Sequence, residues 1–301
     1  MSLIKSLKEF SYISNKIDDR IPIILGPTAS GKTEFAINLC RNINGEIISV
    51  DSRQIYKDFK IGTNQPSRKE LEAVTHYLID SIDSTHIINA YEYIELIKKS
   101  MKEIKSKNKK PVLVGGSLLY INLLINGIIP EQNKEKINGQ NHDYKTNSEL
   151  WSILNELDST RAQDIHPNDR KKIERAIDII NDSGKTVTQL YNEQGVSRDN
   201  ENFYIIELAN DRDFLNSKIK IRLHQMLEDG WVDEVRGLIS NGASIDSHPM
   251  QSIGYRQIVE YLDDKWDKEA LAEEIYKRTR LFAKRQLTWI RKIKKDILIK
   301  C

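Results

Sequence analysis

The sequence predicts an α/β fold, in which helices cover both faces of a parallel sheet and a small, mainly helical domain is inserted. Two observations predict the sheet. Short runs rich in Ile, Val and Leu alternate with longer segments of helical periodicity. The glycine-rich loop Gly26–Thr33 lies between the first of these runs and a helical segment. A change to polar sequence after Ile129 predicts the insertion.

Five segments are predicted to be strands of the sheet. They are short and apolar, and most are bounded by Gly, Pro, Asn or Asp, as is typical of parallel strands that are buried on both faces. In chain order they are Ile21–Leu25, Glu46–Val50, Tyr77–Ile79, Pro111–Val114 and Phe203–Leu208. Helices are expected between them. The chain after the last strand is predicted to be helical to its end, with breaks at Gly230, Asn241-Gly242 and Pro249.

The segment between the fourth and fifth strands has a different composition. Pro130 opens a polar stretch, residues 131–147, that has few side chains to bury and is predicted to be mobile. Helical patterns follow at Leu150–Leu157 and Asp169–Asn181. We therefore expect a core domain made of residues 1–129 and 203–301, with basic C-terminal helices, and a mainly helical insertion domain of residues 130–202.

Composition places the chain among ordinary globular proteins. It has 301 residues, of which 39% are hydrophobic, and it has no run of about 18 apolar residues and several charges among its first twenty. Neither a membrane helix nor a secretory signal is expected, so we expect a cytoplasmic protein with no membrane partner. The two cysteines, Cys40 and Cys301, form no CxxC pair, so no zinc module or disulfide framework is expected. Nothing in the sequence demands a dimer, and a monomer is expected.

Positive charge is concentrated at the C-terminal end. The net charge is only +2, yet Leu271–Cys301 holds ten Lys and Arg residues against three acidic ones. A helix predicted over Leu271–Lys295 would separate an apolar face from a basic one. The apolar face would hold Ile275, Thr279, Phe282, Gln286, Trp289 and Ile293. The basic face would hold Lys277, Arg280, Lys284, Arg291 and Lys295. Such a face is often only solvated, but its length and single sign favour contact with a nucleic-acid backbone.

The loop Gly26-Pro-Thr-Ala-Ser-Gly-Lys-Thr33 matches the phosphate-binding pattern GxxxxGK[ST]. Its backbone N–H groups, the Lys32 ammonium and the following helix N-terminus can together face one anion. The Thr33 hydroxyl is the expected ligand for a Mg²⁺ ion shared with the phosphates. We therefore predict a P-loop NTPase-like core whose diphosphate-binding residues are Gly26, Pro27, Thr28, Ala29, Ser30, Gly31, Lys32 and Thr33. The loop alone leaves open whether the ligand is ATP, GTP or another diphosphate.

Asp51 follows the second predicted strand directly. The carboxyl edge of an open α/β sheet is where ligands bind, so this carboxylate is predicted to face the phosphate site. A lone aspartate at such a point serves about equally often as a turn or helix-cap residue. Position alone therefore leaves both interpretations open.

Further motifs occur at separated places and in a fixed order. Besides the phosphate loop they are Ile48–Lys57, Ile61–Thr63, His76–Asp80, Val114–Tyr120, His166–Asp169 with Arg175-Ala176, Gln225–Leu227, Gly254–Gln257 and Ala283–Trp289. Together they span about Pro22 to Arg291 and resemble the tRNA dimethylallyltransferase family, also called tRNA isopentenyltransferases. These motifs are far more specific than the phosphate loop by itself.

The resemblance implies transfer of a dimethylallyl group from dimethylallyl diphosphate to the exocyclic amine of the adenine that is 3′-adjacent to the anticodon, with release of diphosphate. It implies that Asp51 accepts the amine proton, because an aromatic amine is a weak nucleophile. Ser117 stands where the family usually has a threonine that bonds the bridging oxygen and the target base, and its hydroxyl is expected to keep that role with looser positioning. Arg222 matches a family arginine near the diphosphate.

The resemblance also implies a tRNA anticodon stem-loop as partner, with the target base turned out of its stack. The residues implied in tRNA contact are Asp51, Ser52, Arg53, Gln54, Ser117, Lys171, Lys172, Arg175, Gln251, Ser252, Ile253, Gly254, Tyr255, Arg256, Lys284 and Arg285. Lys172 stands where the family commonly has arginine, which loses bidentate phosphate geometry. A further family arginine has no match within Pro130–Asn147, where Lys134 and Lys136 are the nearest cations.

Two other functions fit parts of the sequence. A P-loop kinase of nucleosides or small metabolites would bind ATP at the loop and use Asp51 on an acceptor hydroxyl. Against it, no arginine-rich lid pattern follows the fourth strand, and a basic C-terminal helix has no use for a small acceptor. A non-catalytic RNA-binding or GTP-switch protein is opposed by the absence of an [NT]KxD guanine-recognition tetrad.

Overall fold

The computed structural model describes residues 7–127, 145–193, 202–265 and 267–300. Contacts divide the chain into two compact units, which we describe separately. The larger unit comprises Met1–Asn122 and Glu201–Cys301, and the smaller unit comprises Leu123–Asn200. The domain boundaries at residues 130 and 202 stay predictions. Of the stretch 131–147 that was predicted to be mobile, residues 131–144 lie outside the described residues.

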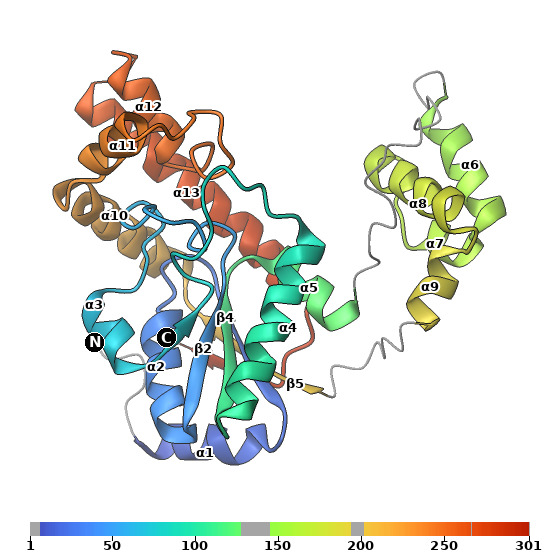
Figure 1. Cartoon of the computed structure of the whole chain (residues 1–301), viewed down its shortest axis with the longest axis horizontal. Helices are drawn as coiled ribbons and strands as arrows, with labels where there is room; N and C mark the ends of the chain where they lie inside the picture. Colours follow the sequence, from blue (N-terminus) through green and yellow to red (C-terminus); the bar gives the residue numbers. More distant parts are fainter. Residues whose placement is uncertain (1–6, 128–144, 194–201, 266, 301) are drawn as a thin grey trace. The chain divides into compact units, whose positions relative to one another are not determined.

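The larger unit is built on a six-stranded, fully parallel sheet with the strand order β3-β2-β4-β1-β5-β6. Strands β2 and β4 lie side by side in it (Figure 1). The strands are β1 (Ile21–Leu25), β2 (Gly45–Val50), β3 (His76–Tyr77), β4 (Lys110–Gly115), β5 (Phe203–Ala209) and β6 (Ile297–Lys300). The five strands predicted from the sequence are confirmed, although β3 is shorter than expected and begins one residue earlier. Apolar residues fill the central strands because both faces of the sheet are covered.

The sixth strand, β6, contradicts the prediction that the chain is helical to its end. It is an edge strand, and Leu298 is 49% exposed, so it lacks the continuous apolar run of the central strands. Asp296 places it beside β5, because its carboxylate accepts the Ile205 N–H at 2.8 Å and its own N–H donates to the Ile205 carbonyl at 3.0 Å. The same carboxylate accepts a hydrogen bond from Arg20 at 2.8 Å. Contacts between residues far apart in the chain therefore create this strand.

Helices cover the two faces of the sheet. On one face, α1 (Leu7–Ile17) packs on α2 (Lys32–Ile43), and Phe10, Phe35 and Leu39 join a buried cluster with strand residues. On the opposite face, α4 (Ala90–Ser106) packs on β2 and β4 (Figure 1). The short helix α3 (Arg68–Ala73) comes after β2 in the chain, and the short helix α5 (Leu118–Asn126) comes after β4. This layering confirms the predicted fold class.

Four helices gather beyond one end of the strands: α10 (Arg212–Glu228), α11 (Trp231–Ser240), α12 (Tyr255–Leu262) and α13 (Lys268–Ile290) (Figure 1). The predicted breaks are confirmed, since Gly230 separates α10 from α11 in a left-handed conformation with φ of +94°. Asn241-Gly242 and Pro249 lie between α11 and α12. Helix α13 packs on α10 and α12.

Helix α13 corrects two parts of the helix predicted over Leu271–Lys295. It ends at Ile290, so Arg291, Ile293 and Lys295 lie outside it, and Lys295 instead pairs with Glu207 of β5 at 3.2 Å. The buried residues of the helix are Leu271, Ile275, Ala283, Gln286 and Ile290. Two residues expected on the apolar face are exposed, Phe282 by 38% and Trp289 by 45%. Each comes one position before a buried residue and therefore points about 100° away from it.

Within its described residues, the smaller unit contains the end of α5 from Leu123 and the helices α6 (Asn147–Leu157), α7 (Ser159–Gln163), α8 (Arg170–Ser183) and α9 (Val187–Glu193). The two predicted helices are confirmed as α6 and α8. Their apolar residues form a separate core around Leu150, Ile173 and Ile177. Buried Asp158 ties α9 to this core, because its carboxylate accepts hydrogen bonds from the Thr188 N–H and hydroxyl at 2.8 and 2.7 Å.

Candidate functional site

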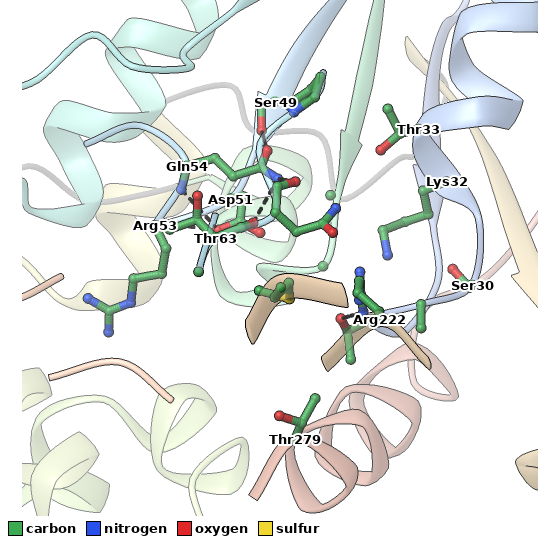
Figure 2. Close-up of a pocket in the computed structure, with 18 of the residues that line it drawn as sticks. Ser30, Lys32, Thr33, Ser49, Asp51, Arg53, Gln54, Thr63, Arg222 and Thr279 are labelled. Atoms are coloured by element: carbon green, nitrogen blue, oxygen red, sulfur yellow. Dashed lines mark hydrogen bonds between the residues drawn. The ribbon is translucent and has the colours of Figure 1, made fainter. Parts of the chain in front are cut away.

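A cleft of about 830 Å³ opens at the carboxyl edge of the sheet in the larger unit. Its walls come from the phosphate loop, the Asp51–Gln54 turn after β2, the Gly115–Ser117 turn after β4, and faces of α10 and α13 (Figure 2). The structure therefore brings the three predicted catalytic residues, Asp51, Ser117 and Arg222, to one cleft together with the loop.

No helix among the described residues is both long enough and apolar enough to cross a membrane.

The phosphate loop has the tight curvature that its sequence predicts. Gly31 precedes α2 with φ of +87°, and Ala29 also has a positive φ of +66°. A Cβ atom at Gly26 would lie 2.4 Å from Ser30 Oγ and 3.2 Å from the Leu208 carbonyl oxygen, so a larger residue would crowd the loop. Ser30 Oγ is itself buried and has no hydrogen-bond partner within the described part of the chain. A buried hydroxyl without a partner is costly unless a ligand satisfies it, which fits an anion site.

Two cations lie side by side under this loop. The Lys32 ammonium donates to the carbonyls of Gly26 and Pro27 at 3.0 and 2.7 Å, and the Arg222 guanidinium donates to the Thr28 hydroxyl. The pKa of Lys32 falls to about 7, mainly because the ammonium is buried and also because Arg222 is positive, while Asp51 acts in the opposite direction. Burial lowers the pKa of Arg222 to about 10, again opposed by Asp51. A polyanion in this cleft would stabilise the charged forms of Lys32 and Arg222, which burial disfavours.

Asp51 lies across the cleft from Lys32 (Figure 2). Its Oδ1 accepts the backbone N–H groups of Arg53 at 2.9 Å and Gln54 at 3.4 Å, so it closes the turn after β2. Tyr93 fixes the start of the turn, because its hydroxyl accepts the Asp51 N–H at 3.1 Å. The Tyr93 ring stacks on Tyr120 at 4.3 Å between centroids. Asp51 thus holds a turn with one oxygen, and Oδ2 takes no part in those two bonds.

Ser117 lies next to this turn. Its Oγ accepts the Ser52 N–H at 3.1 Å, and its own N–H donates to the Val50 carbonyl at 3.3 Å. A serine hydroxyl that accepts one hydrogen bond still has a proton to donate. That proton can reach a ligand that lies between the Asp51 turn and the phosphate loop.

Gln286 of α13 is a further candidate for a functional residue. The sequence placed it only on the apolar face of a predicted helix and within the motif Ala283–Trp289. Its side chain is buried, and its Oε1 accepts the Thr28 N–H at 2.8 Å while its Nε2 donates to the Gly116 carbonyl at 2.9 Å. It therefore joins the phosphate loop to the turn that carries Ser117. The available signal was a polar residue at a position where helical spacing from Ile275 predicts burial.

The other predicted RNA-contact residues are divided between the two units. In the larger unit, Ser52, Gln251, Ser252 and Ile253 line the cleft. Gly254 and Tyr255 are buried against Trp231, and Arg256 lies on the surface beside Glu260 at 3.4 Å. Lys284 and Arg285 are exposed on α13. In the smaller unit, Lys171, Lys172 and Arg175 are exposed on α8. Lys134 and Lys136, the cations nearest to the place of the unmatched family arginine, lie outside the described residues.

Arg53 and Gln54 both belong to the turn but differ in direction. The Arg53 guanidinium donates to the His248 carbonyl, so it points away from the phosphate loop (Figure 2). Gln54 is fully engaged, because its Oε1 accepts the Ser49 hydroxyl proton at 3.0 Å and its Nε2 donates to the carbonyls of Thr63 and Asn64. Gln54 therefore serves to shape the turn in this structure.

A metal ion could be held at Thr33, whose side chain lines the cleft at the start of α2. The described residues contain no group of three or more His, Cys, Asp or Glu side chains that could form a metal cage. Mg²⁺ usually keeps several waters and binds through one or two protein oxygens together with substrate phosphates. The Thr33 hydroxyl in a cleft built for an anion fits that mode of binding.

Comparison with known proteins gives a consistent result. The family model described as IPP transferase matches residues 54–293. A tRNA dimethylallyltransferase from Petrotoga mobilis is 38% identical over 277 residues, which cover 91% of each chain. One from Thermotoga neapolitana is 36% identical over 281 residues, which cover 92% of this chain and 91% of that protein.

Solved structures agree with the sequence relatives. A tRNA isopentenylpyrophosphate transferase from Staphylococcus epidermidis has a TM-score of 0.66 and 32% identity, covering 93% of each chain. A eukaryotic dimethylallyltransferase, described as acting on tRNA, has a TM-score of 0.78 and 26% identity, covering 94% of this chain and 74% of its own.

Proposed function

Because this chain belongs to the IPP transferase family, we propose that it transfers the dimethylallyl group of dimethylallyl diphosphate to the exocyclic amine of the adenine 3′-adjacent to the anticodon. The chain has tRNA dimethylallyltransferase activity. The observation that supports the proposed chemistry most directly is a single cleft with the cationic loop on one side and Asp51 on the other. The kinase interpretation gains no support from this family membership.

In the proposed reaction, the adenine amine nitrogen attacks the first carbon of the prenyl group. The carbon–oxygen bond breaks as the new carbon–nitrogen bond forms, and its electron pair leaves on the diphosphate oxygen. Asp51 accepts the amine proton, which removes the positive charge that would otherwise build up on the nitrogen. Its Oδ2 is the oxygen best suited to this task, because Oδ1 already accepts the Arg53 and Gln54 N–H groups.

The phosphate loop stabilises the leaving group. Negative charge on the diphosphate grows as the carbon–oxygen bond breaks, so Lys32, Arg222 and the loop N–H groups bind the transition state more strongly than the ground state. Lys32 donates two of its three ammonium protons to the Gly26 and Pro27 carbonyls, which leaves one proton for the phosphates. Thr33 would hold Mg²⁺, which would supply further positive charge to offset that of the leaving group. Ser117 can donate its proton to the bridging oxygen or to the base.

We propose that an anticodon stem-loop binds with its backbone on basic side chains. The exposed cations Lys284 and Arg285 of α13, and Lys171, Lys172 and Arg175 of α8, would contact phosphates. Asp51 and Ser52 of the turn, together with Gln251, Ser252 and Ile253, line the cleft and would contact the target base and its neighbours. The monomeric state and the cytoplasmic location stay predictions.

The test uses prenyl-labelled dimethylallyl diphosphate and unmodified tRNA. After reaction, the tRNA is digested to nucleosides, and the label is expected on one adenosine derivative. Variants of the anticodon loop in which the 3′-adjacent adenine is replaced should take up no label. Label on another nucleoside, or label entering RNA from the γ-phosphate of ATP in a parallel reaction, would contradict the proposal.

A further inference from the structure

We propose that Glu234, which lies on α11 and outside the residues given a chemical role above, is a positioning residue that holds the Asp51 turn in place for the incoming adenine. The inference rests on the proposed function of Asp51. It concerns the acceptor side of the cleft, because Glu234 has no hydrogen bond to the phosphate loop in the described structure.

Glu234 anchors a loop by four hydrogen bonds to one carboxylate. Its Oε2 accepts the backbone N–H groups of Lys60 at 3.0 Å and Ile61 at 2.7 Å. Its Oε1 accepts the Gly62 N–H at 3.2 Å and the Tyr255 hydroxyl proton at 2.6 Å. Three successive backbone N–H groups around one anion form a concave cage, which fixes the backbone of residues 60–62 relative to α11.

Hydrogen bonds connect the anchored loop to the Asp51 turn. The carbonyls of Thr63 and Asn64 accept the two Nε2 protons of Gln54 at 3.2 and 2.9 Å. The Gln54 N–H in turn donates to Asp51 Oδ1 at 3.4 Å. Asp51, Gln54 and Thr63 lie together on one side of the cleft (Figure 2). The Gln54 side chain therefore offers a direct route by which a shift of residues 60–64 can reach the carboxylate.

Close packing around Glu234 leaves the loop little freedom. A Cβ atom at Gly62 would lie 2.1 Å from Trp231 Nε1, and one at Gly254 would lie 1.8 Å from the same ring. Trp231 and Phe59 contact the Tyr255 ring at 5.6 and 5.1 Å between centroids. Because this aromatic cluster is closely packed, we expect a change in the Glu234 hydrogen bonds to displace the loop rather than the helix.

The test compares Glu234→Gln with Asp233→Asn. Asp233 is the preceding residue on α11, is 77% exposed and pairs only with Arg236 among the described contacts, so it controls for loss of one charge on the same helix. In Glu234→Gln, the amide nitrogen must face either the Gly62 N–H or the N–H groups of Lys60 and Ile61, and at least one of these donors is left unpaired.

We expect Glu234→Gln to lower kcat/KM for tRNA by roughly 10- to 100-fold, since a displacement of about 1 Å at a reacting group costs that much. The KM for dimethylallyl diphosphate should change by less than about twofold, because the phosphate loop is untouched. Asp233→Asn should match the wild type in both. Equal losses on both substrates, or no loss for tRNA, would overturn the proposal. Tyr255→Phe removes one of the four donors and should give the same selectivity with a smaller loss.

A double-mutant cycle with Gln54→Ala tests the route. If Glu234 acts through Gln54, the effect of Glu234→Gln should largely disappear in the Gln54→Ala background, and additive effects would refute the route. The base role of Asp51 is measured separately with Asp51→Asn. If that variant keeps full turnover, the proposed base role fails, while the coupling between Glu234 and Gln54 still decides whether Glu234 positions the turn.

Discussion

Replacing Asp51 by Asn separates the chemical role of this residue from its structural one. The Asn Oδ1 can still accept the N–H groups of Arg53 and Gln54, so the turn should persist. The position of Oδ2 would hold an amide nitrogen, which cannot accept a proton. A general base contributes roughly 100- to 10,000-fold, or about 2.7 to 5.4 kcal/mol at 1.36 kcal/mol per tenfold. We expect the transfer rate to fall within that range while tRNA still binds.

The assay is single-turnover transfer of labelled prenyl group at saturating tRNA, with tRNA affinity measured separately by fluorescence anisotropy. Asp83→Asn is the matched control, because Asp83 Oδ1 likewise accepts a backbone N–H two residues on, from Thr85 at 2.9 Å, but on an exposed loop outside the cleft. It should leave both quantities unchanged. The reasoning is refuted if Asp51→Asn weakens tRNA binding as much as it slows transfer, or if transfer slows by less than about threefold.

Three further changes test separate parts of the larger unit. Gln286→Glu replaces the buried donor that faces the Gly116 carbonyl by a second acceptor, and leaving that carbonyl unpaired costs roughly 1 to 3 kcal/mol. The KM for dimethylallyl diphosphate should therefore rise at least about fivefold in steady-state assays. Gly62→Ala places a Cβ atom 2.1 Å from the Trp231 ring nitrogen, and overpacking of this kind should lower the free energy of unfolding in urea by roughly 1 to 3 kcal/mol. Burial alone would raise the pKa of Glu46, but hydrogen bonds from Lys109 and a neighbouring tyrosine outweigh it and hold that pKa below its ordinary value of 4.5. Glu46→Gln should therefore destabilise the protein at pH 7, and the difference should vanish as the pH falls below 4.5 through the folded-state pKa, measured by urea unfolding across that range.

For each of these three predictions, one outcome would contradict it. An unchanged KM in Gln286→Glu would show that the Gly116 carbonyl does not need its donor. Gly237→Ala is the control for Gly62, because a Cβ atom there meets nothing within 4 Å inside helix α11, and it should stabilise the helix slightly. Equal destabilisation by both alanine variants would argue against the packing explanation. A loss of stability in Glu46→Gln that is independent of pH would exclude the ionic contribution.

The sequence predicted those parts of the site that depend on local geometry. The phosphate loop is formed by eight consecutive residues between a strand and a helix, so its spacing alone predicts the curvature that Gly31 and Ala29 adopt. Asp51 follows a strand directly, and the carboxyl edge of a parallel sheet is fixed by the fold. Both positions could therefore be assigned before any contact was known.

The remaining parts depend on contacts between distant segments. Gln286 meets Thr28 across 258 residues, and Glu234 meets Gly62 across 172, so no local pattern records either pair. Strand β6 has the same origin, because Asp296 pairs with Ile205 across 91 residues. Phe282 and Trp289 were predicted to lie on the apolar face of α13 because their side chains are large and apolar, but both are exposed. Their exposure is set by what packs against the helix, and periodicity cannot supply that information.

Ser117 shows how a tertiary contact changes an expectation drawn from residue type. A serine has a freer χ1 than the threonine usual in the family, so the sequence favoured looser positioning of the hydroxyl. In the structure, the Ser52 N–H donates to Ser117 Oγ at 3.1 Å, and Ser52 belongs to the turn that Asp51 closes. One lone pair of the hydroxyl is thereby directed at the backbone, which leaves its proton available to a ligand. The hydrogen bond therefore restricts the rotation that the missing methyl group would have restricted, and it comes from the same turn that carries Asp51, the proposed general base.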